Sequence, residues 1–150
     1  MHLTTLNIHP EIFKKISGAA DKLQKSRRAV IVSLLMRLMK DNNRFMGGFK
    51  TVKYQPDNKI GKWHCYHISF KQDEYEFFLD IRKLCKCSVS FLLAIAVDCY
   101  LDECSQKIKK NMDKYPIFNN YVLRQDVLNG IICWHTYWGF PKRHLQTIRT

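Results

Sequence analysis

The sequence has no apolar run long enough to cross a membrane. Its longest apolar stretches, AVIVSLLM and FLLAIAV, are much shorter than the roughly 20 residues that a membrane-spanning helix needs. It also has no secretory signal, because polar and charged residues stand at the beginning, where an apolar run would be needed. We therefore expect a cytoplasmic protein that does not enter membranes and whose six cysteines are reduced thiols.

The motifs of common enzyme classes are missing as well. The chain contains no phosphate-binding loop, nucleophile elbow or metalloprotease helix, and no cysteine and histidine have a spacing that indicates a nucleophile. Zinc ligands are conceivable at His64, Cys65, His67, Cys85 and Cys87, but there is no CxxC pair, and a helix would hold the last two away from the strand that carries the others. We expect no enzymatic activity, no metal and no cofactor.

Acidic residues are few, since 13 Asp and Glu stand against 25 Lys and Arg, and the formal net charge is +12. This charge favours a polyanionic partner, nucleic acid first and an anionic membrane surface second, although many small basic proteins bind neither. Hydrophobic residues make up 46% of the 150 residues, which is enough for the core of one domain, or of one domain with an extension.

The opening stretch LTTLNIHPEIF changes its hydrophobic period. The alternation typical of a strand covers Leu3–Ile8, and the spacing typical of a helix follows from Pro10. A lone strand leaves its backbone groups unpaired, so a partner strand must lie elsewhere in the chain. A shift of 62 residues places CYHISFKQDEY on this stretch, with Leu6 on Ile68. The hydrophobic pattern therefore repeats, although the residues themselves differ.

Each copy of the pattern predicts a strand, a helix, a short turn and a second helix. At the same shift Ser26 aligns with Ser88, and each serine is expected to cap the second helix of its copy. The predicted helices cover about Pro10–Gln24, Ser26 to Lys40, Asp73–Lys86 and Ser88 to Glu103. The predicted division of the chain is 1–41 for the first copy, 42–62 for a linker, 63–104 for the second copy and 105–150 for a helical C-terminal extension.

This order of elements, with a serine before an apolar second helix, resembles the ribbon-helix-helix family of DNA-binding proteins, the Arc, MetJ and CopG type of repressor. The resemblance covers Leu3–Lys40 and about Cys65–Glu103. It implies a mainly α fold in which two copies intertwine and their strands pair into a two-stranded antiparallel ribbon over four helices. Two identical chains ordinarily supply the copies, whereas this chain carries both. We therefore expect a tandem pseudo-dimer in which Cys65–Phe70 pairs with the opening strand.

The resemblance implies a sequence-specific regulator of transcription, a repressor, that inserts the ribbon into the major groove of double-stranded DNA. Strand alternation then directs four polar side chains outward as base contacts: Thr5, Asn7, His67 and Ser69. Contacts to DNA phosphates are expected from the start of each second helix and from the end of the second strand: Lys25, Ser26, Arg27, Arg28, Ser88, Ser90 and Lys71. The alternative is that both sets form an ordinary solvated surface.

The charge is divided unequally between the copies. Residues 1–62 hold thirteen Lys and Arg against four acidic residues, a net +9, whereas residues 63–104 hold four against seven, a net −3. On the DNA-binding interpretation the first copy provides most of the electrostatic attraction. Because the two strands also differ in their outward residues, the target sequence need not be palindromic.

Residues 105–150 lie outside the resemblance. Apolar residues at helical spacing predict a helix from about Asn119 to Trp138. This helix packs on the core or on a second molecule in a dimer, or else it binds a small effector or a protein partner such as a toxin. With a toxin as partner the chain is an antitoxin-like interaction module, which is the alternative to a DNA-binding regulator and is compatible with it.

Overall fold

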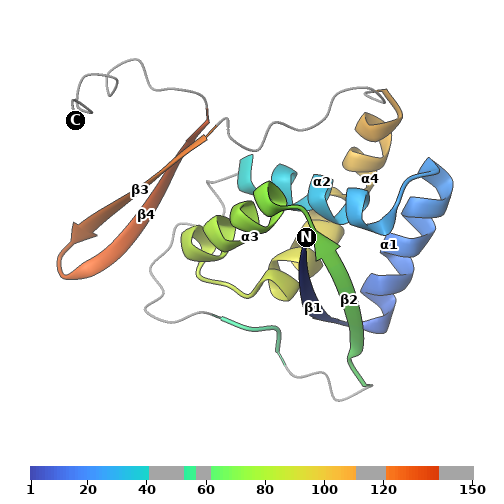
Figure 1. The fold of residues 1–150 in the computed structure, drawn as a ribbon, viewed down its shortest axis with the longest axis horizontal. Helices are drawn as coiled ribbons and strands as arrows, with labels where there is room; N and C mark the ends of the chain where they lie inside the picture. Colours follow the sequence, from blue (N-terminus) through green and yellow to red (C-terminus); the bar gives the residue numbers. More distant parts are fainter. Residues whose placement is uncertain (41–52, 57–61, 111–120, 139–150) are drawn as a thin grey trace.

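The computed structural model describes residues 1–40, 53–56, 62–110 and 121–138. Its elements in chain order are β1 (His2–Ile8), α1 (Pro10–Leu23), α2 (Arg27–Lys40), β2 (His64–Phe70), α3 (Gln72–Cys85), α4 (Val89–Lys110), β3 (Tyr121–Leu128) and β4 (Ile131–Trp138) (Figure 1). We call β1, α1 and α2 the first unit, and β2, α3 and α4 the second unit. The described fold is mainly helical and includes two separate two-stranded antiparallel sheets.

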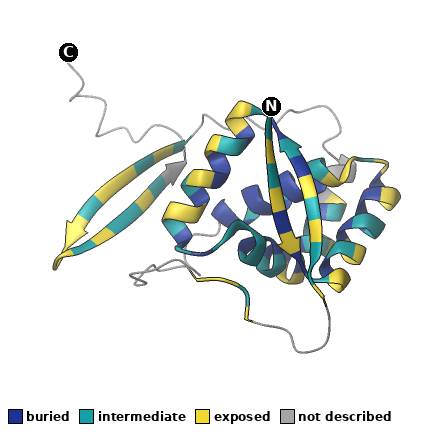
Figure 2. Ribbon diagram, turned by 60° about the horizontal axis from the view of Figure 1, so that its bottom comes forward, coloured by how far each residue is buried: buried dark blue, intermediate teal, exposed yellow. Residues whose placement is uncertain are grey.

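β1 and β2 pair antiparallel along their whole length and form the ribbon. The predicted pairing of the opening strand with residues 65–70 is confirmed, and β2 begins one residue earlier than expected. The buried residues of the ribbon alternate with more exposed ones along both strands, as the bands of colour in Figure 2 show. The inward side chains that reach the core are Leu6, Ile8, Ile68 and Phe70.

Both units use the same local signals to begin and end their helices. Ser26 and Ser88 stand just before α2 and α4, and their hydroxyl oxygens accept hydrogen bonds from backbone N–H groups three residues on, at 3.1 and 3.2 Å. α1 and α3 are followed by the capping residues Gln24 and Lys86, which both have φ of 53°, a left-handed conformation that stops a helix and redirects the chain. Each element of the second unit begins 62 residues after its counterpart in the first.

The hydrophobic core lies between the ribbon and the four helices. α2 and α4 pack on each other through its middle, and they bury the largest share of its side chains: Val30, Ile31, Leu34, Leu35, Leu38, Met39, Leu92, Leu93, Ala96 and Val97. Phe70 from the ribbon and Phe78 from α3 meet edge to face, with ring centroids 4.2 Å apart. Because every layer of this core draws on both units, neither unit buries its apolar face alone.

Residues 53–56 lie beside the turn between α3 and α4. The N–H of Lys53 donates to the carbonyl of Lys86 at 2.8 Å, and the carbonyl of Lys53 accepts from the N–H of Ser88 at 2.7 Å. These two backbone hydrogen bonds hold Tyr54 and Gln55 near the start of α4. The rest of the predicted linker, residues 42–52 and 57–61, lies outside the described residues.

The helix predicted over Asn119–Trp138 is wrong, because β3 and β4 form a hairpin there. Asn129 and Gly130 make its two-residue turn with φ of 52° and 75°. Two consecutive residues in the left-handed conformation match the twist of paired strands, and Asn-Gly is the residue pair that adopts this conformation most readily. The helical spacing of apolar residues was therefore misleading, and the Asn-Gly turn was the better signal. Residues 111–120 and 139–150 lie outside the described residues.

The β3–β4 hairpin contacts the body of the protein through α3 (Figure 1). The Tyr121 hydroxyl donates to the Asp80 carboxylate at 2.7 Å, and the Tyr121 ring meets the Phe77 ring edge to face at 6.0 Å. The Lys83 ammonium lies 5.6 Å from the centre of the Trp134 ring. Burial, and then the hydrogen bond to Asp80, raise the pKa of Tyr121. The hairpin is thus attached to the second unit, on an element that does not belong to the ribbon.

Candidate nucleic-acid interface

The outward face of the ribbon carries six side chains in three facing pairs. The pairs are Leu3 with Ser69, Thr5 with His67, and Asn7 with Cys65. Five of the six are exposed and Ser69 is half-buried. The structure therefore brings the four residues predicted to contact bases onto one face. The major groove of B-DNA, which is about 12 Å wide, admits a two-stranded β-ribbon of this kind.

Thr5 and His67 lie at the centre of this face and are bonded to each other. Thr5 Oγ1 and His67 Nδ1 are 3.0 Å apart. Whichever of the two donates, the bond uses Nδ1 and leaves Nε2 of the ring directed elsewhere. When the threonine hydroxyl donates, Nε2 carries the proton and is a donor; when Nδ1 donates, Nε2 of the neutral ring is an acceptor. The central pair can therefore present either a donor or an acceptor.

Asn7 lies near the end of β1, where the linker supports the strand. The side-chain nitrogen of Gln55 donates to the backbone carbonyl of Asn7 at 3.1 Å. This bond satisfies a carbonyl on the outer edge of β1 and fixes the backbone from which the Asn7 amide projects. A side-chain amide offers a donor and an acceptor together, which is the pattern that adenine presents in the major groove.

The start of α2 holds four of the residues predicted to contact phosphate. Ser26 is exposed and caps the helix, and Lys25 beside it is half-buried. Arg27 is exposed: its Nε donates to the Ser17 hydroxyl at 3.0 Å, and its guanidinium lies 5.2 Å from the centre of the Phe13 ring. These contacts orient Arg27 without neutralising its charge, so its guanidinium remains able to bind an anion.

Arg28 has an acidic partner that the sequence did not indicate. Its guanidinium lies 3.7 Å from Oε2 of Glu74 at the start of α3, and the Glu74 side chain is only 6% exposed. The same Glu74 oxygen accepts from the backbone N–H of Lys71 at 2.9 Å. Arg28 is thus committed to a nearly buried carboxylate of the other unit, and little of its charge is left for a phosphate.

The corresponding positions of the second unit carry less charge. Ser88 and Ser90 at the start of α4 are half-buried, and the Ser88 hydroxyl is occupied as the helix cap. Lys71 is the only lysine among the three predicted residues, and it lies between β2 and α3. The predicted phosphate contacts are therefore stronger at α2 than at α4. This difference agrees with the unequal net charges of the two parts of the sequence.

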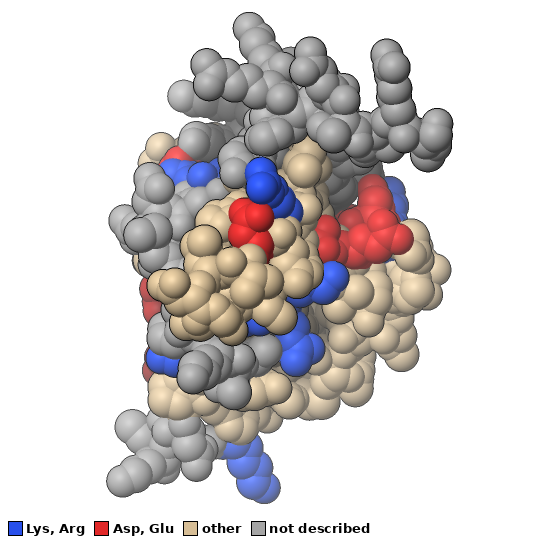
Figure 3. All heavy atoms as spheres, turned by 90° about the vertical axis from the view of Figure 1, so that its left-hand side faces the viewer, with Lys and Arg blue, Asp and Glu red and all other residues tan. Residues whose placement is uncertain are grey.

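The acidic side chains of the second unit gather largely on α3, which carries Asp73, Glu74, Glu76 and Asp80. Figure 3 shows a face of the molecule on which acidic side chains form separate groups with Lys and Arg side chains among them. On α3, Lys83 and Asp80 form an ion pair at 3.8 Å. The charge on this face is mixed, and it offers no continuous basic surface among the described residues that are visible there.

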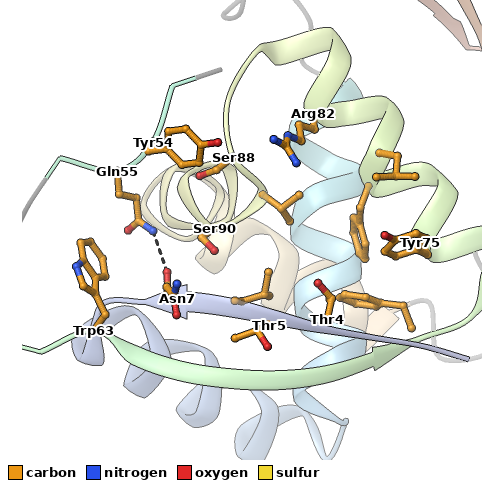
Figure 4. A pocket seen from close by; sticks show the side chains of 15 residues that line it. Thr4, Thr5, Asn7, Tyr54, Gln55, Trp63, Tyr75, Arg82, Ser88 and Ser90 are labelled. Atoms are coloured by element: carbon orange, nitrogen blue, oxygen red, sulfur yellow. Dashed lines mark hydrogen bonds between the residues drawn. The ribbon is translucent and has the colours of Figure 1, made fainter. Parts of the chain in front are cut away.

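A hollow of about 490 Å³ opens between β1, α3 and the start of α4, and sequence reasoning missed it. Thr4 and Asn7 line it from the ribbon, and Arg82, Ser88 and Ser90 line it from the helices (Figure 4). Its remaining polar and aromatic walls are Thr5, Tyr54, Gln55, Trp63, Phe70, Tyr75 and Phe78. Residues 54 and 55 come from the linker, whose course the sequence pattern does not reveal. A comparison of Thr4 with its counterpart at the 62-residue shift, the much larger Tyr66, was the one available signal.

Of the three cysteines considered as zinc ligands, Cys85 and Cys87 are buried in the core, whereas Cys65 is exposed on the ribbon. Burial, and then the neighbouring Cys87, raise the pKa of Cys85 to about 12, so the metal-binding thiolate is disfavoured there. Within the described residues no three His, Cys, Asp or Glu side chains form a group that could hold a metal ion. None of the described helices is both long and apolar enough to cross a membrane.

No protein-family model matches this chain, and no curated protein or solved structure matches it either.

Proposed function

We propose that residues 1–104 form a tandem ribbon-helix-helix pseudo-dimer and that the protein is a sequence-specific regulator, a repressor, that binds double-stranded DNA. The β1–β2 ribbon enters the major groove with its outward face against the base edges. The observation that carries this proposal is the register, in which Thr5 lies directly opposite His67, its counterpart 62 residues on. A local two-fold axis at this pair relates the two strands, as expected for a ribbon that straddles two half-sites.

The two halves of the ribbon read different sequences. In one half, where Asn7 faces Cys65, the Asn7 amide bonds an adenine. In the other half, where Leu3 faces Ser69, the Ser69 hydroxyl bonds a base edge and the methyl groups of Leu3 contact a thymine methyl. His67 bonds a base edge at the centre, between the two halves. Leu3 is 75% exposed although it is apolar, so a contact with DNA would remove an apolar side chain from water. We therefore expect two unequal half-sites.

Phosphate binding is concentrated on one side of the ribbon. Arg27 and Lys25 at the start of α2 provide positive charge for these phosphate contacts, whereas Ser88 and Ser90 at the start of α4 provide neutral hydroxyls. Phosphate contacts position a protein on DNA and make its affinity depend on salt. The attraction is therefore strongest over the half-site that flanks α2.

The direct test is selection of bound sequences from random duplex DNA, followed by measurement of Kd for the selected duplex and for an unrelated one. We expect an asymmetric motif. Asn7→Ala and His67→Ala should each weaken binding of the selected duplex by about tenfold or more, the effect of one lost base contact. Binding of the unrelated duplex should change little. Arg27→Ala should weaken binding of both duplexes and lower the salt dependence by about one phosphate contact.

A matched control is Gln125→Ala, which removes an exposed side-chain amide from β3, far along the chain from the ribbon. This variant should bind the selected duplex like the unchanged protein. The proposal fails if selection yields no motif, or if Asn7→Ala and His67→Ala bind the selected duplex as tightly as Gln125→Ala does.

A second candidate function is a protein-interaction module, such as an antitoxin, that uses the β3–β4 hairpin. The observation in its favour is the exposure of three apolar side chains at the end of the hairpin that holds its turn: Val127 at 63%, Leu128 at 56% and Ile132 at 49%. Deletion of residues 111–150, which lie after α4, separates the two functions. DNA binding that survives this deletion supports the ribbon, whereas capture of a partner that is lost on deletion supports the hairpin.

A further inference from the structure

The hollow lies at the first edge of the ribbon, which β1 forms, beside the start of α4. It differs from the equivalent position at the other edge, which β2 forms. There Phe13 packs on His64 and on Tyr66, with ring centroids 4.1 and 5.3 Å apart. At the first edge His2 stacks on Tyr75 at 4.6 Å in the same manner, but Thr4 stands where the other strand has Tyr66. A small side chain in place of an aromatic ring therefore leaves the first edge open.

The walls of the hollow combine flat apolar surfaces with a positive charge. Tyr54, Trp63 and Tyr75 provide aromatic surfaces at its sides (Figure 4). Arg82 reaches into it from α3, and its side chain forms no hydrogen bond or ion pair with any described residue. At the other edge the counterpart of Arg82 is Ala20, which is buried in the core. A guanidinium without a partner among the described residues is thus particular to the edge that is also hollow.

The volume of the hollow and the chemistry of its walls suit a small molecule. Sites for small ligands commonly measure about 300–1,000 Å³ and combine aromatic walls with a few convergent polar groups. Here the convergent groups are the Arg82 guanidinium and the hydroxyls of Thr4 and Ser90, which have no described hydrogen-bond partner. A guanidinium binds a carboxylate through two parallel hydrogen bonds and stacks on aromatic rings.

We propose that the hollow binds a small aromatic carboxylate and that its occupation weakens binding of DNA. The ring system lies between the aromatic walls, and the carboxylate binds Arg82. The second half of the proposal depends on the DNA-binding function proposed above: Asn7 and Thr5 line the same hollow, so the bound carboxylate adds negative charge beside the strand that reads DNA. Because coupling between two ligands is reciprocal, DNA lowers the affinity for the carboxylate by the same factor.

The test for binding uses no DNA. Titration calorimetry of the full chain with 2-naphthoate, and with the uncharged 2-naphthamide as its matched control, measures the contribution of the carboxylate. We expect the acid to bind about ten- to a hundredfold more tightly than the amide, the effect of a charge-assisted hydrogen bond. Arg82→Gln should remove this preference. The control variant Lys22→Gln, which changes an exposed charge on α1, should keep it.

Thr4→Tyr provides an independent test because it copies the residue of the other strand. We expect it to fill the hollow and abolish binding of both compounds while the thermal unfolding temperature is retained. If Thr4→Tyr does not fold, Ser90→Leu narrows the hollow from the opposite wall and should act in the same way. The proposal is overturned if 2-naphthoate produces no heat of binding, if the acid and the amide bind equally, or if Arg82→Gln and the filled variants bind like the unchanged protein.

The regulatory half is tested with the DNA duplex obtained by selection. Saturating 2-naphthoate should raise the Kd for that duplex, and it should leave the Kd of Arg82→Gln unchanged. Binding of 2-naphthoate with no effect on DNA affinity refutes the regulation and keeps the binding site. A chain that binds no DNA at all leaves the calorimetric result to stand by itself, so failure of the proposed function and failure of this inference are distinguishable.

Discussion

We expect the ion pair between Arg28 and Glu74 to contribute measurably to the free energy of unfolding, because it joins the two units through a nearly buried carboxylate. At 3.7 Å and an effective dielectric constant of about 20, the attraction between two unit charges is about 4.5 kcal/mol. Desolvation of Glu74 opposes most of this attraction. Since 31% of the Arg28 side chain is exposed, water also replaces part of the interaction. We expect a net coupling between the two residues of about 1–2 kcal/mol.

A double-mutant cycle in urea, followed by helical circular dichroism, measures this coupling. Arg28→Ala should lower the free energy of unfolding by about 2 kcal/mol, because it leaves Glu74 buried with the N–H of Lys71 as its remaining described partner. In the Glu74→Ala protein, the further change Arg28→Ala should lower the free energy of unfolding by less than about 1 kcal/mol. Arg27→Ala is the matched control, and it should lower this free energy by less than about 1 kcal/mol both with Glu74 and with Glu74→Ala. Equal costs of Arg28→Ala with and without Glu74 would refute the coupling.

The hairpin turn, the helix caps and the thiols allow further tests. Gly130→Ala should lower the melting temperature of the β3–β4 hairpin, followed by Trp fluorescence, because a φ of 75° disfavours alanine by about 1 kcal/mol. Ser26→Ala and Ser88→Ala should each lower the free energy of unfolding in urea by about 1 kcal/mol. The stability should fall as pH rises above about 9, since the unfolded Cys85 thiol ionises there while its folded pKa is about 12. Cys85→Ala should reduce this fall, and at pH 8 the exposed Cys65 should react with a thiol reagent long before Cys85 does.

Much of the fold of residues 1–104 could be predicted because its signals are local. Alternation at Leu6 and Ile8 indicates a strand, and a serine before an apolar stretch indicates a helix start at Ser26. Both signals recur 62 residues later, and repetition of a weak pattern in one register is stronger than either copy alone. The strand pairing followed from the need of a lone strand for a partner. Helix ends were predicted to within a few residues, except that α4 extends to Lys110 instead of Glu103.

The C-terminal hairpin was mispredicted because two signals conflicted. Apolar residues such as Leu123, Val127 and Ile131 recur at intervals of four, which fits one face of a helix, and this spacing was given priority. Yet Asn129-Gly130 lies between two stretches rich in β-branched and aromatic residues, the composition of a hairpin. A helix through Gly130 would also be less stable, because glycine loses more conformational entropy in a helix than other residues do.

The partners within the candidate interface could not be predicted, because they depend on contacts between distant segments. Glu74 reaches Arg28 only when α3 lies beside the start of α2, and Gln55 reaches Asn7 only when the linker passes the edge of β1. The positions of Thr5 and His67 were expected, but the bond between them depends on the register. Sequence pattern assigns residues to faces, and only the packing of those faces decides which charges remain available to a ligand.

The same contacts explain what a single chain gains when it carries both units. In a dimer of identical chains, any substitution occurs at both edges of the ribbon. Here Thr4 opens one edge while Tyr66 closes the other, and Arg28 pairs with Glu74 while the counterparts of these two residues are the neutral Ser90 and the buried Ile12. The ion pair and the concentration of charge therefore occur at one edge, and the hollow occurs at the other. This freedom permits the proposed interface to have a strongly basic half and, at the opposite edge, a half that is open to a small ligand.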